Sequence, residues 1–288
     1  MLHYRSLLFV PAHREGWALK AARTGTDALI LDLEDAVPPA AKEHARQALA
    51  AQVSEAKQEV PGIGIVVRIN EWGTAEADLD VAALAKVGVD AVMVPKLDEP
   101  RTAQDLGAVL AYVARSEGRR VPGIIGILES ARAIVNASAL AAVDGVHGLA
   151  IGAAADGDTA RSVGYRWTAT GVETLTMRSN TVLACRSVAG CVPYVGLWQD
   201  IEDLEGLRSF AMSNRELGFL GQTLIHPSHV AVVNAAFSLT SAEVDFYSGL
   251  IDAYQKAAES GVGAVVYRGQ HIDLAHVTRA RELLRARV

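Results

Sequence analysis

The feature that most constrains the fold of this chain is an eightfold alternation of short apolar runs with helix-like segments rich in Ala, Leu and charged residues. The apolar runs are nearly continuous, as expected of parallel strands buried on both faces, and the segments between them have helical periodicity. Eight such units in about 230 residues favour a (β/α)8 barrel, which takes roughly 250, over a doubly wound open sheet. The expected strands are residues 6–10, 28–34, 65–70, 91–96, 123–129, 148–153, 192–197 and 222–227.

The pattern changes near the C-terminus. We expect residues 1–235 to form the barrel and residues 236–288 to form a C-terminal helical extension. The extension reads as a helix, a short hairpin-like stretch (AVVYRGQHID) and a final helix.

Composition excludes several classes of protein. Half of the residues are hydrophobic, but no uninterrupted apolar stretch is long enough to span a bilayer, and the N-terminal segment lacks the features of a signal peptide. The net charge of −6, without a basic stripe, disfavours nucleic-acid binding. Cys185 and Cys191, the two cysteines, suit a reducing compartment. We therefore expect a cytoplasmic protein that binds neither nucleic acid nor membrane and that needs a locally positive pocket for an anionic substrate.

Polar residues gather where the expected strands end. The stretch LILDLEDAV, residues 29–37, closes an apolar run with three carboxylates, which must either cap a turn or face a positive group because unpaired buried charges are costly. The carboxyl ends of barrel strands share one rim, which is the active-site face. The polar residues at or after these ends are Arg14, Asp32, Glu34, Asp35, Arg68, Asn70, Lys96, Glu129, Asp156, Asp158 and His226.

This set suggests metal-assisted chemistry. Glu129 and Asp158 follow adjacent strands and suffice to anchor Mg²⁺, which takes one or two protein carboxylates plus water and substrate oxygens. Arg68 offers a fork of donors to a substrate carboxylate or an enolate oxygen. Because side chains alternate along a strand, Asp32 and Glu34 are the pair expected to point inward and orient that arginine. In the alternative interpretation, each charged residue is only a solvated cap or a structural ion pair.

Longer motifs add a resemblance. RSLLFVPA, DALILDLEDAVPPAAKEHAR with Lys42 and Arg46, VVRIN, VMVPK, ILES and GFLGQTLIHPSHVAVVNAAFS occur in this order, followed by the tail AVVYRGQHIDLAHVTRARELL. In order and spacing they resemble the citrate lyase β-subunit-like branch of the HpcH/HpaI aldolase family, over residues 5 to 286. Single motifs such as VRIN are weak, but the ordered set is specific.

The resemblance implies a (β/α)8 barrel that assembles into homotrimers or hexamers. It also implies a Mg²⁺-dependent reaction that breaks or forms a carbon–carbon bond between a 2-oxo acid and the acyl group of a thioester, on CoA or on a carrier protein. Family substrates include malyl-CoA, β-methylmalyl-CoA, citramalyl-CoA and the citryl thioester. The family's arginine falls on Arg68 and its metal glutamate on Glu129. Its tail aspartate, an acid/base supplied by a neighbouring subunit, falls on Asp273.

The family's metal aspartate is placed by spacing. Where the family reads Gly-Ala-Glu-Asp, this chain reads AAADGD, and counting six residues back from Gly164 selects Asp158, with Asp156 as the fallback. The resulting hypothesis is a lyase, or reverse synthase, that works through an enolate. In it the catalytic residues are Arg68, Asp273, Glu34 and Asp32, the substrate-binding residues are Arg14, Arg68, Lys96 and Asp35, and the metal ligands are Glu129 and Asp158.

Departures from the family keep two other functions open. Ala12 replaces a glycine, Glu15 a proline and Gln222 a lysine, which favours a metal-dependent aldolase acting on free 4-hydroxy-2-oxo acids, and Tyr194 stands where an aspartate is common. The irregular AAADGD stretch permits a non-catalytic barrel that has lost a ligand. Asp273 also has a structural interpretation as the N-cap of a helix beginning at LAHVTRAREL.

Overall fold

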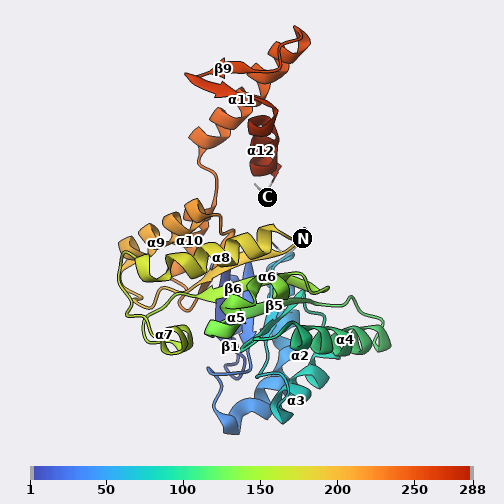
Figure 1. The fold of residues 1–288 in the computed structure, drawn as a ribbon. Coiled ribbons are helices and arrows are strands. Elements are labelled where there is room, and N and C mark those ends of the chain that lie inside the picture. Colours follow the sequence, from blue (N-terminus) through green and yellow to red (C-terminus); the bar gives the residue numbers. More distant parts are fainter. Residues whose placement is uncertain (1–2, 286–288) are drawn as a thin grey trace. The chain divides into compact units, whose positions relative to one another are not determined.

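The computed structural model describes residues 3–285. The chain divides into two compact units, Met1–Phe237 and Ser238–Val288, so the division lies two residues beyond the expected one (Figure 1). Each unit is described by itself.

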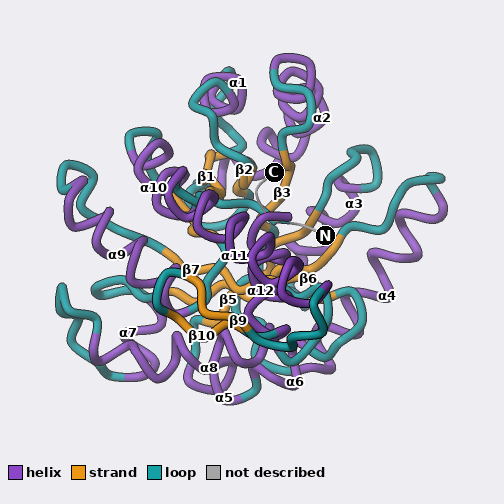
Figure 2. The backbone as a smooth tube through the Cα atoms, turned by 90° about the horizontal axis from the view of Figure 1, so that it is seen from above, coloured by secondary structure: helices purple, strands orange, loops and turns teal. Residues whose placement is uncertain are grey.

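The first unit is a closed barrel of eight parallel strands in sequence order, which confirms the predicted (β/α)8 fold. The strands occupy the centre, and helices surround them (Figure 2). The strands are β1 (Ser6–Pro11), β2 (Ala28–Asp32), β3 (Gly64–Arg68), β4 (Ala91–Val94), β5 (Gly123–Leu128), β6 (Val146–Gly152), β7 (Val192–Gly196) and β8 (Gly221–Leu224).

Several strands end earlier than the sequence predicted. β2 ends at Asp32 rather than at residue 34, β3 at Arg68 rather than 70, and β4 at Val94 rather than 96. The apolar pattern continues past these ends because the loops carry fully buried side chains. The polar residues of the rim therefore stand partly on strand ends and partly on the loops that follow.

Helices cover the outside of the barrel. They are α1 (Trp17–Ala22), α2 (Lys42–Glu59), α3 (Ala75–Leu84), α4 (Pro100–Ser116), α5 (Ala131–Val135), α6 (Ala137–Ala141), α7 (Asp158–Val163), α8 (Leu175–Arg186), α9 (Leu204–Leu217) and α10 (His229–Phe237), with short 3₁₀ turns at Pro39–Ala41 and Val172–Thr174. The large apolar layer between strands and helices contains residues such as Leu8, Leu29 and Ile65.

A second, smaller apolar cluster fills the barrel interior, with Leu7, Ile30, Met93 and Tyr194 among its members. At the amino end of the strands the Tyr4 ring closes the interior, so near to β3 that a Cβ built on Gly64 would lie 2.4 Å from it. Packing of this kind is typical of such barrels and leaves the opposite rim for chemistry.

The second unit consists of α11 (Ser241–Glu259), a hairpin of β9 (Val265–Tyr267) and β10 (Gln270–Ile272), and α12 (Leu274–Arg285). This is the order of elements expected for the extension. Thr240 and Glu243 form a capping box at the start of α11. Leu250, Ile272, Val277 and Ala280 form a small core of its own.

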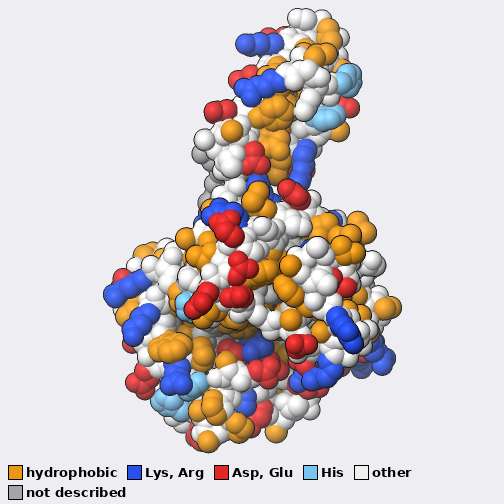
Figure 3. All heavy atoms as spheres, turned by 90° about the vertical axis from the view of Figure 1, so that its left-hand side faces the viewer, with side chains coloured by type: hydrophobic (Ala, Val, Ile, Leu, Met, Phe, Trp, Pro, Cys, Tyr) orange, Lys and Arg blue, Asp and Glu red, His pale blue; other side chains and the backbone are white. Residues whose placement is uncertain are grey.

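Among the described residues, no helix combines the length and apolarity needed to cross a membrane. On the face drawn in Figure 3, basic side chains are interspersed with acidic ones.

Candidate active site

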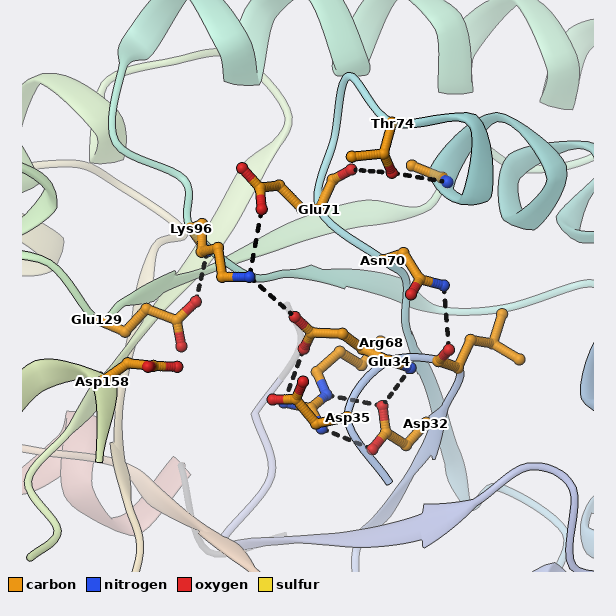
Figure 4. Close-up of polar contacts among 12 residues, drawn as sticks. Asp32, Glu34, Asp35, Arg68, Asn70, Glu71, Thr74, Lys96, Glu129 and Asp158 are labelled. Atoms are coloured by element: carbon orange, nitrogen blue, oxygen red, sulfur yellow. Dashed lines mark hydrogen bonds and ion pairs between the residues drawn. The ribbon is translucent and has the colours of Figure 1, made fainter. Parts of the chain in front are cut away.

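An arginine with two buried carboxylates lies at the carboxyl ends of β2 and β3. Asp32 and Arg68 are the last residues of these strands and are register partners. Arg68 donates from Nε to Asp32 Oδ1 at 2.7 Å and from Nη2 to Oδ2 at 2.6 Å (Figure 4). Asp32, which is 1% exposed, also accepts hydrogen bonds from the backbone N–H groups of Glu34 and Ala36. The Asp32 carboxylate is therefore fully occupied in fixing Arg68 and the turn that follows β2.

Glu34 completes this cluster. Its carboxylate lies 3.0 Å from Arg68 Nη1 and 3.8 Å from Lys96 Nζ. Burial raises the pKa of Glu34 to about 7, and the charges of Asp35 and Glu129 act in the same direction, whereas Arg68 and Lys96 oppose them. A carboxyl that titrates near neutrality is suited to accept and return a proton.

Arg68 remains charged in this setting. Burial opposes its charge, but the hydrogen bonds and the negative charge of Asp32 raise its pKa. Its guanidinium also lies over the Phe9 ring, 4.9 Å from the ring centre. Asp35 lies farther away, 3.9 Å from Arg68, with 73% of its side chain exposed. Of the three acids in DLED, the structure thus brings Asp32 and Glu34 inward and leaves Asp35 at the surface.

A pair of carboxylates lies beside this cluster. Glu129 follows β5 and Asp158 begins α7; the two side chains lie close together (Figure 4) and line, with Arg68, a cavity of about 160 Å³. Burial and the charge of Asp158 raise the pKa of Glu129. Glu129 Oε1 accepts a hydrogen bond from the Lys96 backbone N–H at 2.6 Å, which fixes its position.

Two adjacent carboxylates that repel each other are a fitting donor set for a hard divalent cation, which removes the repulsion. The described residues contain no group of three or more His, Cys, Asp and Glu side chains that could hold a metal. Glu129 and Asp158 would therefore be the protein ligands, and water or substrate oxygens would complete the coordination of Mg²⁺.

The structure also distinguishes the two aspartates of AAADGD. Asp158 lines the cavity, and its Oδ1 atom pairs with Arg161 at 2.6 Å. Asp156 is exposed on the preceding turn, with a left-handed backbone (φ 52°), and does not line the cavity. Asp158 is the aspartate placed beside Glu129.

The remaining expected residues lie at the margin or elsewhere. Lys96 Nζ reaches Glu71 at 3.2 Å, at the edge of the site. Arg14 is exposed and lies over Trp17, 5.7 Å from its ring centre. His226 Nδ1 hydrogen-bonds Ser228 within its own loop, at 2.7 Å.

Asp273 belongs to the second unit. Its Oδ1 atom accepts the Ala275 backbone N–H at 3.0 Å, at the start of α12, and contacts His276 Nδ1 at 2.6 Å. The hydrogen bond with His276 lowers the pKa of Asp273, whose charged form is thereby favoured. The helix-capping interpretation of Asp273 is thus observed, and it leaves the outer carboxylate lone pairs accessible.

Sequence reasoning gave no role to Lys42, which supports the site from behind. Its ammonium donates to the carbonyl oxygens of Leu33 at 2.8 Å and Glu34 at 3.1 Å, and to Asn70 Oδ1 at 2.6 Å. It thereby joins the loop after β2 to the loop after β3. Its place in the motif DLEDAVPPAAK was a visible signal, but the carbonyl partners are not encoded in a residue pattern.

The departures from the family lie away from the cavity. Ala12 and Gln222 are both fully buried. Thr223 lines the cavity, so its neighbour Gln222 faces the opposite side of β8, toward the helices. Tyr194 packs in the barrel interior. None of these three residues lines the cavity.

The geometry can be set against known proteins. Residues 5–227 match the family model described as HpcH/HpaI aldolase/citrate lyase. The chain belongs to this family. It is 33% identical over 288 residues to a (3S)-malyl-CoA thioesterase of Cereibacter sphaeroides, covering 98% of this chain and 93% of that protein. It is 30% identical to an L-malyl-CoA/beta-methylmalyl-CoA lyase of Rhodobacter capsulatus, covering 98% and 93%.

The fold is also similar to that of solved structures. The fold matches CitE from Mycobacterium tuberculosis in complex with magnesium, acetoacetate and coenzyme A, with a TM-score of 0.77, 30% identity and coverage of 99% of this chain and 98% of that one. The relatives include lyases and thioesterases that act on CoA thioesters. Within the family, the arrangement of Arg68, Glu129 and Asp158 on one cavity is the feature from which a function can be argued.

Proposed function

We propose that this protein is a Mg²⁺-dependent carbon–carbon lyase, or synthase in reverse, which cleaves a 3-hydroxyacyl thioester of the malyl-CoA, citramalyl-CoA or citryl type into a 2-oxo acid and an acyl thioester. The observation that supports this most strongly is the carboxylate pair Glu129–Asp158 on the same cavity as the Arg68 guanidinium. When bound by the pair, Mg²⁺ supplies a Lewis acid that draws charge from oxygens of the oxo-acid half.

The protein side chains divide the remaining work. Arg68, held in one orientation by Asp32, faces the oxygen on which negative charge develops. Because every accessible position on the Asp32 carboxylate is occupied, we assign it a positioning role. Glu34, whose pKa of about 7 suits proton transfer, takes the proton of the substrate hydroxyl as the carbon–carbon bond breaks.

The bond's electron pair then rests on the thioester as an enolate, whose carbon must receive a proton. We assign this step to Asp273 of a second copy of the chain, in a homotrimer or hexamer. In the synthetic direction the charged form of Asp273, favoured by its lowered pKa, takes a proton from the acyl thioester; in the cleavage direction the carboxyl must first gain a proton from solvent, which it then gives to the enolate carbon. Lys96, at the edge of the site, and the exposed Arg14 and Asp35 are proposed to contact the substrate outside the cavity.

A second candidate function is hydrolysis of the thioester, favoured by the similarity to the (3S)-malyl-CoA thioesterase. Free 4-hydroxy-2-oxo acids are a third substrate class, favoured by the departures at Ala12, Glu15 and Gln222. The carboxylate pair argues against a non-catalytic barrel, since Asp158 does lie beside Glu129.

A product assay separates these functions. Malyl-CoA, citramalyl-CoA, a citryl thioester and free 4-hydroxy-2-oxo acids are incubated with the protein, with Mg²⁺ or with EDTA. A lyase releases glyoxylate, pyruvate or oxaloacetate together with an acyl thioester. A thioesterase releases the hydroxy diacid and a free thiol, which a thiol reagent detects. Formation of free thiol without oxo acid, or equal turnover in EDTA, would contradict the proposal.

A further inference from the structure

Two threonine side chains line the cavity and offer hydroxyl groups to it. Thr159 and Thr223 are each 4% exposed, and neither hydroxyl bonds to another residue in the described part of the chain. A hydroxyl that lines a cavity and is not used within the protein can donate to a ligand or to water. These two side chains therefore give the cavity wall two donors for a polar group of a ligand.

Two glycines make room for these hydroxyls. Gly152 and Gly196 are the last residues of β6 and β7 and are register partners. A Cβ built on Gly152 would lie 3.0 Å from Thr159 Oγ1, and one built on Gly196 would lie 2.6 Å from Thr223 Oγ1. The two hydroxyls thus stand over neighbouring strand ends, in space that any other residue type would fill.

The rest of the lining identifies the group that they bind. The other polar residues among those lining the cavity are Arg68, Glu129 and Asp158. Arg68 is assigned above to the oxygen on which charge develops, and the two acids cannot donate when ionised. A carboxylate that enters this cavity brings several acceptor lone pairs, and the two threonine hydroxyls are neutral side-chain donors in the cavity wall.

We infer that the hydroxyls of Thr159 and Thr223 donate hydrogen bonds to the carboxylate of the 2-oxo acid. This inference rests on the function proposed above and adds two substrate-binding residues to it. Hydrogen bonds to a charged group are about twice as strong as neutral ones, so each hydroxyl is expected to change affinity about tenfold.

The test uses the full chain and binding as well as turnover. Calorimetry with Mg²⁺ present measures the Kd of glyoxylate, pyruvate and oxaloacetate for the wild type, for Thr159→Val and for Thr223→Val. Valine keeps the shape and removes the hydroxyl, whereas Thr159→Ser and Thr223→Ser keep the hydroxyl as matched controls. Each valine variant should raise Kd about tenfold for all three acids, and the serine variants should change it less than threefold.

Mg²⁺ affinity in the absence of oxo acid, and KM for acetyl-CoA in the synthetic direction, should stay unchanged in the valine variants. Wild-type affinity in both valine variants would overturn the inference, as would equal losses in valine and serine variants, which indicate packing. A loss of affinity confined to oxaloacetate would also overturn the inference, because the hydroxyls would then bind the second carboxylate of oxaloacetate and not the carboxylate that all three acids share.

The outcome is separable from that of the proposed function. If the wild type binds pyruvate but cleaves no thioester, the proposed lyase function is contradicted. The hydrogen bonds from the threonines to the carboxylate are then still tested by the Kd values of the variants. A wild type that binds none of the three acids contradicts both.

Discussion

Replacing Asp32 by asparagine should destabilise the protein strongly, because it breaks a buried ion pair while keeping the size of the side chain. Asp32 is 1% exposed and holds two nitrogens of Arg68 at 2.7 and 2.6 Å. Removing one partner of a buried pair costs about 3–5 kcal/mol. Glu34 remains 3.0 Å from Arg68 Nη1, so we expect the lower end, about 3 kcal/mol.

The assay is urea denaturation at fixed protein concentration in EDTA. Under these conditions, bound metal and protein concentration do not cause differences in unfolding free energy between the variants. Asp35→Asn is the matched control, since Asp35 faces the same arginine at 3.9 Å but is 73% exposed, and exposed pairs contribute about 0–1 kcal/mol. Turnover of Asp32→Asn should also fall, because Arg68 loses its fixed orientation. Equal unfolding free energies for the two variants would refute the argument that Asp32 organises the site.

Two further perturbations follow from the same cluster. Burial raises the pKa of Glu34 from 4.5 to about 7, so the folded chain holds a proton that the unfolded chain has lost, and the free energy of unfolding should fall as pH rises through this window. Glu34→Gln, measured in EDTA, should flatten that dependence, and an unchanged slope would contradict the assignment. Lys42→Met removes the donor to three buried acceptors, so it should lower the free energy of unfolding by about 2–4 kcal/mol and slow turnover. The control is Lys20→Met on the exposed side of α1, which should change the free energy of unfolding by less than about 0.5 kcal/mol.

The barrel was predictable because burial on both faces leaves a strong sequence pattern and because eight repeats leave few alternatives. The strand ends were predicted too late, since the apolar pattern records burial rather than ladder hydrogen bonds. Leu33, Ile69 and Leu97 are fully buried although they lie beyond the strands. A run of apolar residues therefore does not show whether a residue is buried within a strand or in the loop that follows it.

That Arg68 and Glu129 line one cavity was predictable, because each charge stands at or directly after a strand end. The position of Thr159 and Thr223 on the cavity could not be predicted in this way, because it depends on the space left by Gly152 and Gly196 in the folded barrel. The choice between Asp156 and Asp158 also required the backbone, since both fit a carboxylate pattern within three residues.

The central claim is that Glu129 and Asp158 form a divalent cation site, and calorimetric titration of Mg²⁺ tests it most directly. The titration compares the wild type with Glu129→Gln, Asp158→Asn and, as a control, Asp156→Asn, each with pyruvate present. We predict one Mg²⁺ bound per chain by the wild type and by Asp156→Asn, and no binding by the other two variants. Undiminished Mg²⁺ binding by Glu129→Gln, or no binding by the wild type, would contradict it.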